Sequence, residues 1–288
     1  MLVDQQPFPT TEKDDADAIA YFQAQQQAFE LAAATVGGVQ VQDYGIGSYT
    51  IRLRFAGSAL IPAMTPAIAH LAIPPVAQPD FTISLWDSTS TQIMSPSPPW
   101  RDDPYAYGSH GEILGYSQEH MRIAFNMAFD ALSMWHIDTS QAVFWVRDAA
   151  NIPFWETAAP LRIILHWWLG SQGLRYIHAA AVGTPTAAAL LVGKGGSGKS
   201  TTALTCLDSD LTYVSDDYCL LATEPEPRAY SLYNSAKLKP DNHRLPHLLP
   251  LIHNTDRASE DKPFILLHQH YPEKIVPSLP LKVILVPR

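Results

Sequence analysis

Residues 187–204 read AAALLVGKGGSGKSTTAL, and the eight residues 193–200 within this stretch fit the pattern G-x-x-x-x-G-K-[ST]. A short apolar run precedes the glycines, and we expect the segment after them to be helical. Glycines allow successive backbone N–H groups to turn inward around phosphates, and the start of the helix adds the positive end of its dipole. The stretch therefore predicts an α/β fold with a phosphate-binding loop.

The loop also carries the side chains that this chemistry requires. Lys199 is expected to reach the outer phosphates as a compact charge, and the Ser200 hydroxyl is expected to ligate magnesium. The residues that we expect to contact ATP, with Mg2+ as its companion, are Gly193, Gly195, Gly196, Ser197, Gly198, Lys199, Ser200, Thr201 and Lys237. Lys237 has a second interpretation, because it and Lys239 could simply be solvated lysines.

Two adjacent carboxylates follow the next apolar run, where residues 211–217 read LTYVSDD. Magnesium prefers oxygen ligands, so a carboxylate at a strand end near the loop suits a metal-nucleotide site. A kinase needs a second carboxylate within reach of the attacking hydroxyl. An Asp-Asp pair taken alone is more often a turn, but its position one helix after the loop favours a site at Asp216 and Asp217.

His178 lies 15 residues before Gly193, on the strand that we expect to precede the strand of the loop. A single histidine in an apolar strand is usually a hydrogen-bonded core residue. If its strand is a neighbour of the acidic pair, it can instead orient or tune a carboxylate.

Taken together, His178, the loop and the acidic pair, which begins 23 residues after Gly193, resemble the catalytic core of HPr kinase/phosphorylase. The resemblance implies a P-loop kinase core of the HPr kinase and phosphoenolpyruvate carboxykinase type. It implies that Asp216 is the catalytic acid/base, that Asp217 helps to hold magnesium, and that His178 supports Asp216. Thr201 is a departure, since the family usually carries a glutamate at that place.

The resemblance is good over residues 176–221 and weaker from there to the end of the chain. In the first half, residues 50–57 and 79–87 are similar to HPr-kinase-like proteins of peptide-maturation systems of the lasso-peptide type. Some of those proteins phosphorylate a serine of a precursor peptide. The resemblance therefore implies a protein or peptide acceptor with a serine.

Hydrophobic patterns predict the remaining elements. We expect a helix over 14–34, strands over 49–55, 81–86, 120–126, 129–136 and 141–147, and a helix after Ser58 that Pro66 bends or interrupts. A helix over 161–169 and strands over 176–182, 187–192, 211–217 and 281–288 follow. We therefore divide the chain into an α+β N-terminal domain, residues 1–150, which could recognise the acceptor, and a P-loop domain, residues 151–288.

Composition excludes several classes of protein. The chain has 288 residues, 47% of them hydrophobic, and a net charge of -9 without a basic stripe, which argues against nucleic-acid binding. No signal peptide or membrane-length apolar run is present, so we expect a cytoplasmic protein that does not engage a membrane. The two cysteines are expected to be small buried side chains.

These observations predict an ATP-dependent kinase that transfers the γ-phosphoryl group to a serine hydroxyl. The alternative is a nucleotide-binding regulatory module, or an NTPase switch without an acceptor, which needs one metal-side Asp and no base. The sequence leaves open the nucleotide preference, the formation of a homo-oligomer and whether the chain is a shortened form of a longer protein.

Overall fold

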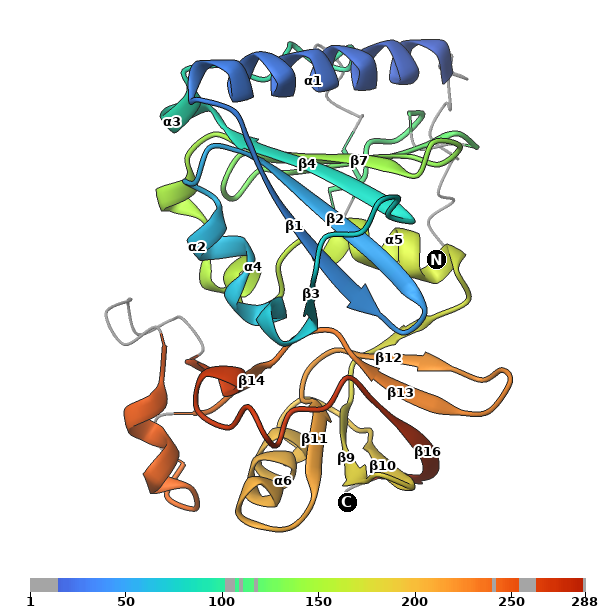
Figure 1. Cartoon of the computed structure of the whole chain (residues 1–288), viewed down its shortest axis with the longest axis vertical. Helices are drawn as coiled ribbons and strands as arrows, with labels where there is room; N and C mark the ends of the chain where they lie inside the picture. Colours follow the sequence, from blue (N-terminus) through green and yellow to red (C-terminus); the bar gives the residue numbers. More distant parts are fainter. Residues whose placement is uncertain are drawn as a thin grey trace, which may run out of the picture.

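The computed structural model describes residues 15–101, 107–108, 111–116, 119–239, 242–253 and 263–286. Within these residues the chain forms two large mixed sheets with helices packed against them, an α/β arrangement in which the first sheet lies above the second in Figure 1. None of the helices described here is long and apolar enough to cross a membrane.

The first sheet is built from the first half of the described chain and has seven strands in the order β3-β1-β2-β4-β7-β6-β5. Its strands are β1 (Val39–Ile46), β2 (Tyr49–Ala56), β3 (Ala72–Ile73), β4 (Phe81–Asp87), β5 (Met121–Asn126), β6 (Ala131–His136) and β7 (Gln141–Val146). The central strands β2, β4 and β7 are parallel, and the outer pairs are antiparallel.

Alternation along these strands gives the first sheet two apolar faces. On β4, Phe81, Ile83 and Leu85 point to one face, while Trp86 points to the other. The long helix α1 (Asp15–Thr35) covers the face of Trp86 with side chains such as Phe22 and Phe29, and α5 (Arg162–Ser171) covers the opposite face (Figure 1). Short elements complete this half, namely α2 (Ile61–Met64), the 3-10 helix η1 (Pro66–Leu71), α3 (Ser88–Thr91), η2 (Ala149–Asn151) and α4 (Phe154–Ala158).

The second sheet also has seven strands in the described residues, in the order β11-β9-β10-β16-β13-β12-β8. They are β8 (Arg175–Ile177), β9 (Ala180–Thr184), β10 (Ala187–Leu191), β11 (Thr212–Ser215), β12 (Cys219–Ala222), β13 (Arg228–Ser231) and β16 (Ser278–Leu285). Only β10 and β16 pair in parallel among them. The helix α6 (Lys199–Thr205) and the 3-10 helix η3 (Cys206–Asp208) connect β10 to β11. Beside the sheet lie a small pair, β14 (Ser235–Lys237) and β15 (Phe264–Leu266), and the 3-10 helices η4 (Pro246–Leu251) and η5 (Leu267–Gln269).

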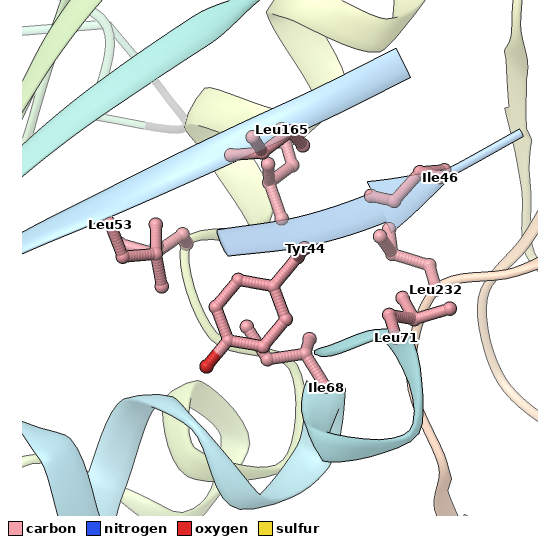
Figure 2. Close-up of a pocket in the computed structure, with 9 residues that line it drawn as sticks. Tyr44, Ile46, Leu53, Ile68, Leu71, Leu165 and Leu232 are labelled. Atoms are coloured by element: carbon pink, nitrogen blue, oxygen red, sulfur yellow. The ribbon is translucent and has the colours of Figure 1, made fainter. Parts of the chain in front are cut away.

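One apolar core runs from the first sheet into the second half of the chain. Trp168 of α5 stacks on Phe81 of β4, with ring centroids 4.6 Å apart and planes within 4°. Leu232 and Phe264 belong to the same cluster of buried side chains. This core contains a cavity of about 10 Å³. Apolar side chains that include Leu232 line it (Figure 2), and a cavity this small and apolar is not a ligand site. The helices α4 and α5, which we assigned to the second domain, thus pack under the first sheet, and the division at residue 150 stays a prediction.

Most of the expected elements are present, with small shifts at their ends, and the expected helix after Ser58 is interrupted at Pro66 between α2 and η1. The expected strand over 176–182 is wrong, because the chain bends at His178 and forms two strands. β8 pairs with β12, whereas β9 pairs with β10 and β11. The apolar pattern is continuous across the bend, so distant pairing partners decide where the strand breaks. Among the described residues, strands β1, β3, β12, β14 and β15 were not expected.

Candidate functional site

The glycine-rich loop lies between the end of β10 and the start of α6, as the motif predicts. Gly196 and Gly198 have φ angles of 82° and 90°, in the left-handed region where a side chain would be strained. Residues 193–196 are exposed. The backbone of the loop is therefore accessible at the N-terminus of α6, where an anion would meet N–H groups and the helix dipole.

Lys199 is buried beneath this loop rather than extended into solvent. Its Nζ donates hydrogen bonds to the carbonyl oxygens of Gly193, at 2.8 Å, and Lys194, at 3.1 Å. The Ser197 hydroxyl oxygen is buried and, among the described residues, lacks a hydrogen-bond partner. An ammonium group and an unpaired hydroxyl in a glycine-rich loop at a helix N-terminus are donors that a phosphate needs, so these residues fit a nucleotide phosphate.

The two aspartates of the acidic pair have different environments. Asp216 follows β11 directly and is 1% exposed, and its Oδ2 accepts a hydrogen bond of 2.9 Å from the backbone N–H of Lys237. Burial raises the pKa of Asp216 to about 6, and the Lys237 N–H and the nearby Ser200 side chain oppose part of that rise. Its other oxygen, Oδ1, is buried without a protein partner in the described chain. A carboxylate oxygen beside Ser200 with no protein partner suits magnesium.

Asp217 is more accessible and is held by side chains. Its Oδ1 lies 2.8 Å from Nε2 of His178, and its Oδ2 forms an ion pair with Nζ of Lys237. His178 was expected to support Asp216, but its direct contact is with the neighbouring carboxylate, and its functional role stays a prediction. His178 lies in the bend between β8 and β9 with 58% of its side chain exposed, so it is not a core residue of a strand.

Lys237 connects both aspartates to β14. Its backbone N–H binds Asp216 while its ammonium group binds Asp217, so the interpretation as a solvated lysine is wrong for this residue. Lys239, two residues further on, is exposed. The motif pattern alone could not distinguish the two lysines, because the contacts of Lys237 with the acidic pair join β14 to residues about 20 positions away.

The structure also places Thr201 and the two cysteines. Thr201 lies on α6, and its hydroxyl accepts a hydrogen bond of 3.4 Å from the Asn242 side chain. Cys219 is buried as expected, whereas Cys206 is only partly buried, so the expectation was wrong for it.

Within the described residues, no group of three or more His, Cys, Asp or Glu side chains could hold a metal ion by itself. A metal here would need ligands from the nucleotide, which is how magnesium is usually bound with phosphates.

Two further residues lie beside the acidic pair and were missed in the sequence. Tyr218 follows Asp217, and its ring centroid lies 5.9 Å from that of His178. Arg162, the first residue of α5, donates a hydrogen bond of 3.0 Å from Nη1 to the Tyr218 hydroxyl. A basic residue at the first position of a helix opposes the helix dipole and was a usable signal in the sequence.

Comparison with known proteins finds similarity among solved structures. No protein-family model and no curated protein matches this chain. Among solved structures, the chain is similar to the structure of the Hpr(Ser) kinase/phosphatase from Coxiella burnetii, with 15% sequence identity and a TM-score of 0.29. The similarity covers 39% of this chain and 64% of that one, so the chain spans less than two thirds of the protein that it matches. A similarity of this extent carries no inference about activity, which has to come from the contacts described above.

Proposed function

We propose that this chain is a magnesium-dependent ATP kinase that transfers the γ-phosphoryl group to a serine hydroxyl of a protein or peptide. The observation that carries the proposal is the pair of unequal carboxylates beside the glycine-rich loop. Asp216 is buried next to Ser200, and Asp217 is partly exposed and is held by two side chains. A kinase needs one carboxylate for the metal and another for the acceptor hydroxyl, whereas a nucleotide switch needs only the first.

The phosphates bind at the loop between β10 and α6. Backbone N–H groups of residues 193–198 and the N-terminus of α6 supply donors, and Ser197 supplies a hydroxyl that has no protein partner. Lys199 leaves the carbonyl oxygens of Gly193 and Lys194 and turns its ammonium group to the outer phosphates. Without nucleotide, the ammonium group of Lys199 is bound to the loop backbone.

The metal side of the site consists of Ser200 and Asp216. When bound, magnesium neutralises charge on the phosphates and aligns the transferred group. This assignment reverses the one implied by the family resemblance, which gave the metal to Asp217 and the base to Asp216. The reason is geometric, because Asp216 is the carboxylate that lies beside Ser200 and it is too buried to meet an acceptor.

The acceptor side consists of Asp217, His178 and Lys237. Asp217 accepts the proton of the serine hydroxyl as that oxygen attacks the γ-phosphorus. The bond between the γ-phosphorus and the β,γ-bridging oxygen breaks, and ADP is the leaving group. His178 and Lys237 hold the carboxylate from two directions, one at each oxygen, which fixes its orientation. Lys237 also places positive charge beside the group in transfer.

Magnesium titrations of Asp216→Asn and Asp217→Asn test this assignment. Asn keeps the shape of Asp but cannot act as a base and ligates magnesium poorly. We expect Asp216→Asn to raise the magnesium requirement and to regain activity in excess metal. We expect Asp217→Asn to keep magnesium-ATP affinity and to lose transfer by about a hundredfold or more. The exposed Asp210, changed to Asn, is the matched control.

The readout is the fate of label from γ-labelled ATP, followed into serine peptides and into free phosphate. If excess metal rescues Asp217→Asn instead, the roles are those that the family resemblance implies. Label that enters only free phosphate, for every peptide and protein acceptor tried, contradicts the kinase and supports the alternative of an NTPase switch.

A further inference from the structure

An arginine lies on the acceptor side of the site, outside the residues that handle phosphate. Arg162 is partly buried, and its Cζ lies 5.4 Å from the centroid of the Tyr218 ring, in addition to the hydrogen bond between Nη1 and the Tyr218 hydroxyl. Tyr218 is the residue after Asp217. The Tyr218 side chain therefore lies between Arg162 and Asp217, the proposed base.

The charge of Arg162 is not neutralised by a contact. Among the residues that the structure describes, no carboxylate lies within 4.0 Å of its guanidinium, and its one hydrogen bond goes to a tyrosine hydroxyl. The other polar groups around it are Tyr176, Tyr233 and the carboxyl group of Glu156. Glu156 is occupied by another contact, because its Oε1 accepts a hydrogen bond of 2.8 Å from the backbone N–H of Leu161. A guanidinium has five N–H donors, so most of those on Arg162 are available to a ligand.

The position of Arg162 on its helix adds to the positive potential. It is the first residue of α5, and the residue before it, Leu161, provides no side-chain cap. Basic side chains are usually found at the other end of a helix, where they complement the dipole. Here the positive end of a ten-residue helix and a guanidinium lie close together, and the buried carboxyl group of Glu156 accepts its hydrogen bond from the residue just before the helix.

The Tyr218 ring links this charge to the reacting centre. Nζ of Lys237 lies 5.8 Å from the centroid of the same ring, and the His178 ring lies 5.9 Å from it. Lys237 and His178 are both engaged by Asp217. Of the cationic groups around Tyr218, Arg162 is thus the one that is not engaged by a carboxylate in the described structure.

We propose that Arg162 and the Tyr218 hydroxyl form a specificity subsite for a carboxylate of the acceptor, a few residues from the serine that is phosphorylated. The planar guanidinium matches a carboxylate with two parallel N–H donors, and the tyrosine hydroxyl supplies a third. The chain carries a net charge of -9, so an acidic acceptor would be repelled at long range and needs a local cation to dock. This inference rests on the proposed kinase function.

The test compares two peptides that differ only in charge. Each has a single serine, flanked by glutamates in one peptide and by glutamines in the other. We expect the wild-type protein to prefer the glutamate peptide by about tenfold to a hundredfold in kcat/KM, mostly through KM, because hydrogen bonds to charged groups dominate such contacts. Arg162→Gln should abolish the preference, Arg162→Lys should retain part of it, and Tyr218→Phe should reduce it.

Two controls separate this subsite from the rest of the site. Arg175→Gln makes the same change of charge at an exposed residue of β8 and should retain the preference. The affinity of Arg162→Gln for magnesium-ATP should equal that of the wild type, which shows that the variant is folded and that the nucleotide side is intact. A preference that survives in Arg162→Gln, or a wild-type protein that treats both peptides alike, overturns the proposal.

Binding of the same peptides, carrying a fluorescent label and measured without nucleotide, is the readout that does not depend on transfer. A glutamate preference that is present in the wild type and lost in Arg162→Gln supports the subsite even if no phosphate moves. In that case the kinase proposal fails while the anion subsite stands. Equal binding of the two peptides to the wild type contradicts the subsite itself.

Discussion

Replacing Glu156 with Gln is expected to change how the stability of this protein depends on pH. Glu156 lies on α4, and burial raises the pKa of its carboxyl group to about 7, although the Leu161 N–H and the charge of Arg162 both act to lower it. The folded protein therefore holds a proton on Glu156 over a pH range in which the unfolded chain has released it. Glutamine imitates the protonated form, which has no charge.

The magnitude follows from the two pKa values. The ordinary value is 4.5, and the difference from about 7 corresponds to about 3 kcal/mol of unfolding free energy. Because the folded-state pKa is the higher of the two, this contribution is present in full below about pH 4.5. It is lost as the pH rises through about 7, where the buried carboxyl group ionises. Glu156→Gln should therefore gain stability relative to the wild type as the pH rises.

The assay is urea unfolding at a series of pH values from about 5 to 8, followed by tryptophan fluorescence, for the wild type and Glu156→Gln. The difference in unfolding free energy between the two proteins should change by about 2 to 3 kcal/mol over this range. Glu273→Gln, at an exposed position, is the matched control and should give a curve parallel to that of the wild type. Parallel curves for Glu156→Gln as well would refute the inference that burial governs this carboxyl group.

Two further predictions concern nucleotide binding and the unit that folds. Lys199→Ala should weaken magnesium-ATP binding by about tenfold to a hundredfold, because it removes one charged donor at the outer phosphates, and it should leave the thermal midpoint of unfolding unchanged. Affinity is measured by calorimetry, and an unchanged affinity would rule out the assignment of a phosphate-binding loop. A separate fragment of residues 151–288 is expected to aggregate. Without the first sheet, the face of α5 that carries Trp168 is exposed, so a fragment that elutes as a folded monomer in size-exclusion chromatography would contradict the shared core.

Short-range patterns in the sequence were enough to locate the candidate site. The glycine-rich loop could be read directly because its geometry needs glycines and a following helix within a few residues, and the chain forms β10, the loop and α6 in that order. The acidic pair could be read because it ends an apolar run. Strands of the first sheet such as β2 and β4 were predictable for the same reason, since their side chains alternate with a period of two residues.

The tertiary structure decided how these parts face one another. The sequence alone could not show which aspartate lies beside Ser200. Adjacent residues point in opposite directions, and which of the two points toward Ser200 depends on how the chain turns after β11. The link between His178 and Asp217 depends on the bend between β8 and β9, which is set by pairing with strands far along the chain.

The same holds for the acceptor side. Arg162 and Tyr218 are 56 positions apart, and Lys237 reaches Asp217 across 20 positions through the pairing of β14 with β15. What the sequence by itself determined is the local chemistry of the loop and of the acidic pair. The tertiary structure decided the mutual orientation of the loop and the acidic pair, and the position of Arg162 beside them. These contacts join segments that are far apart in the sequence and pack around a common core, and they leave no periodic pattern in the residues that make them.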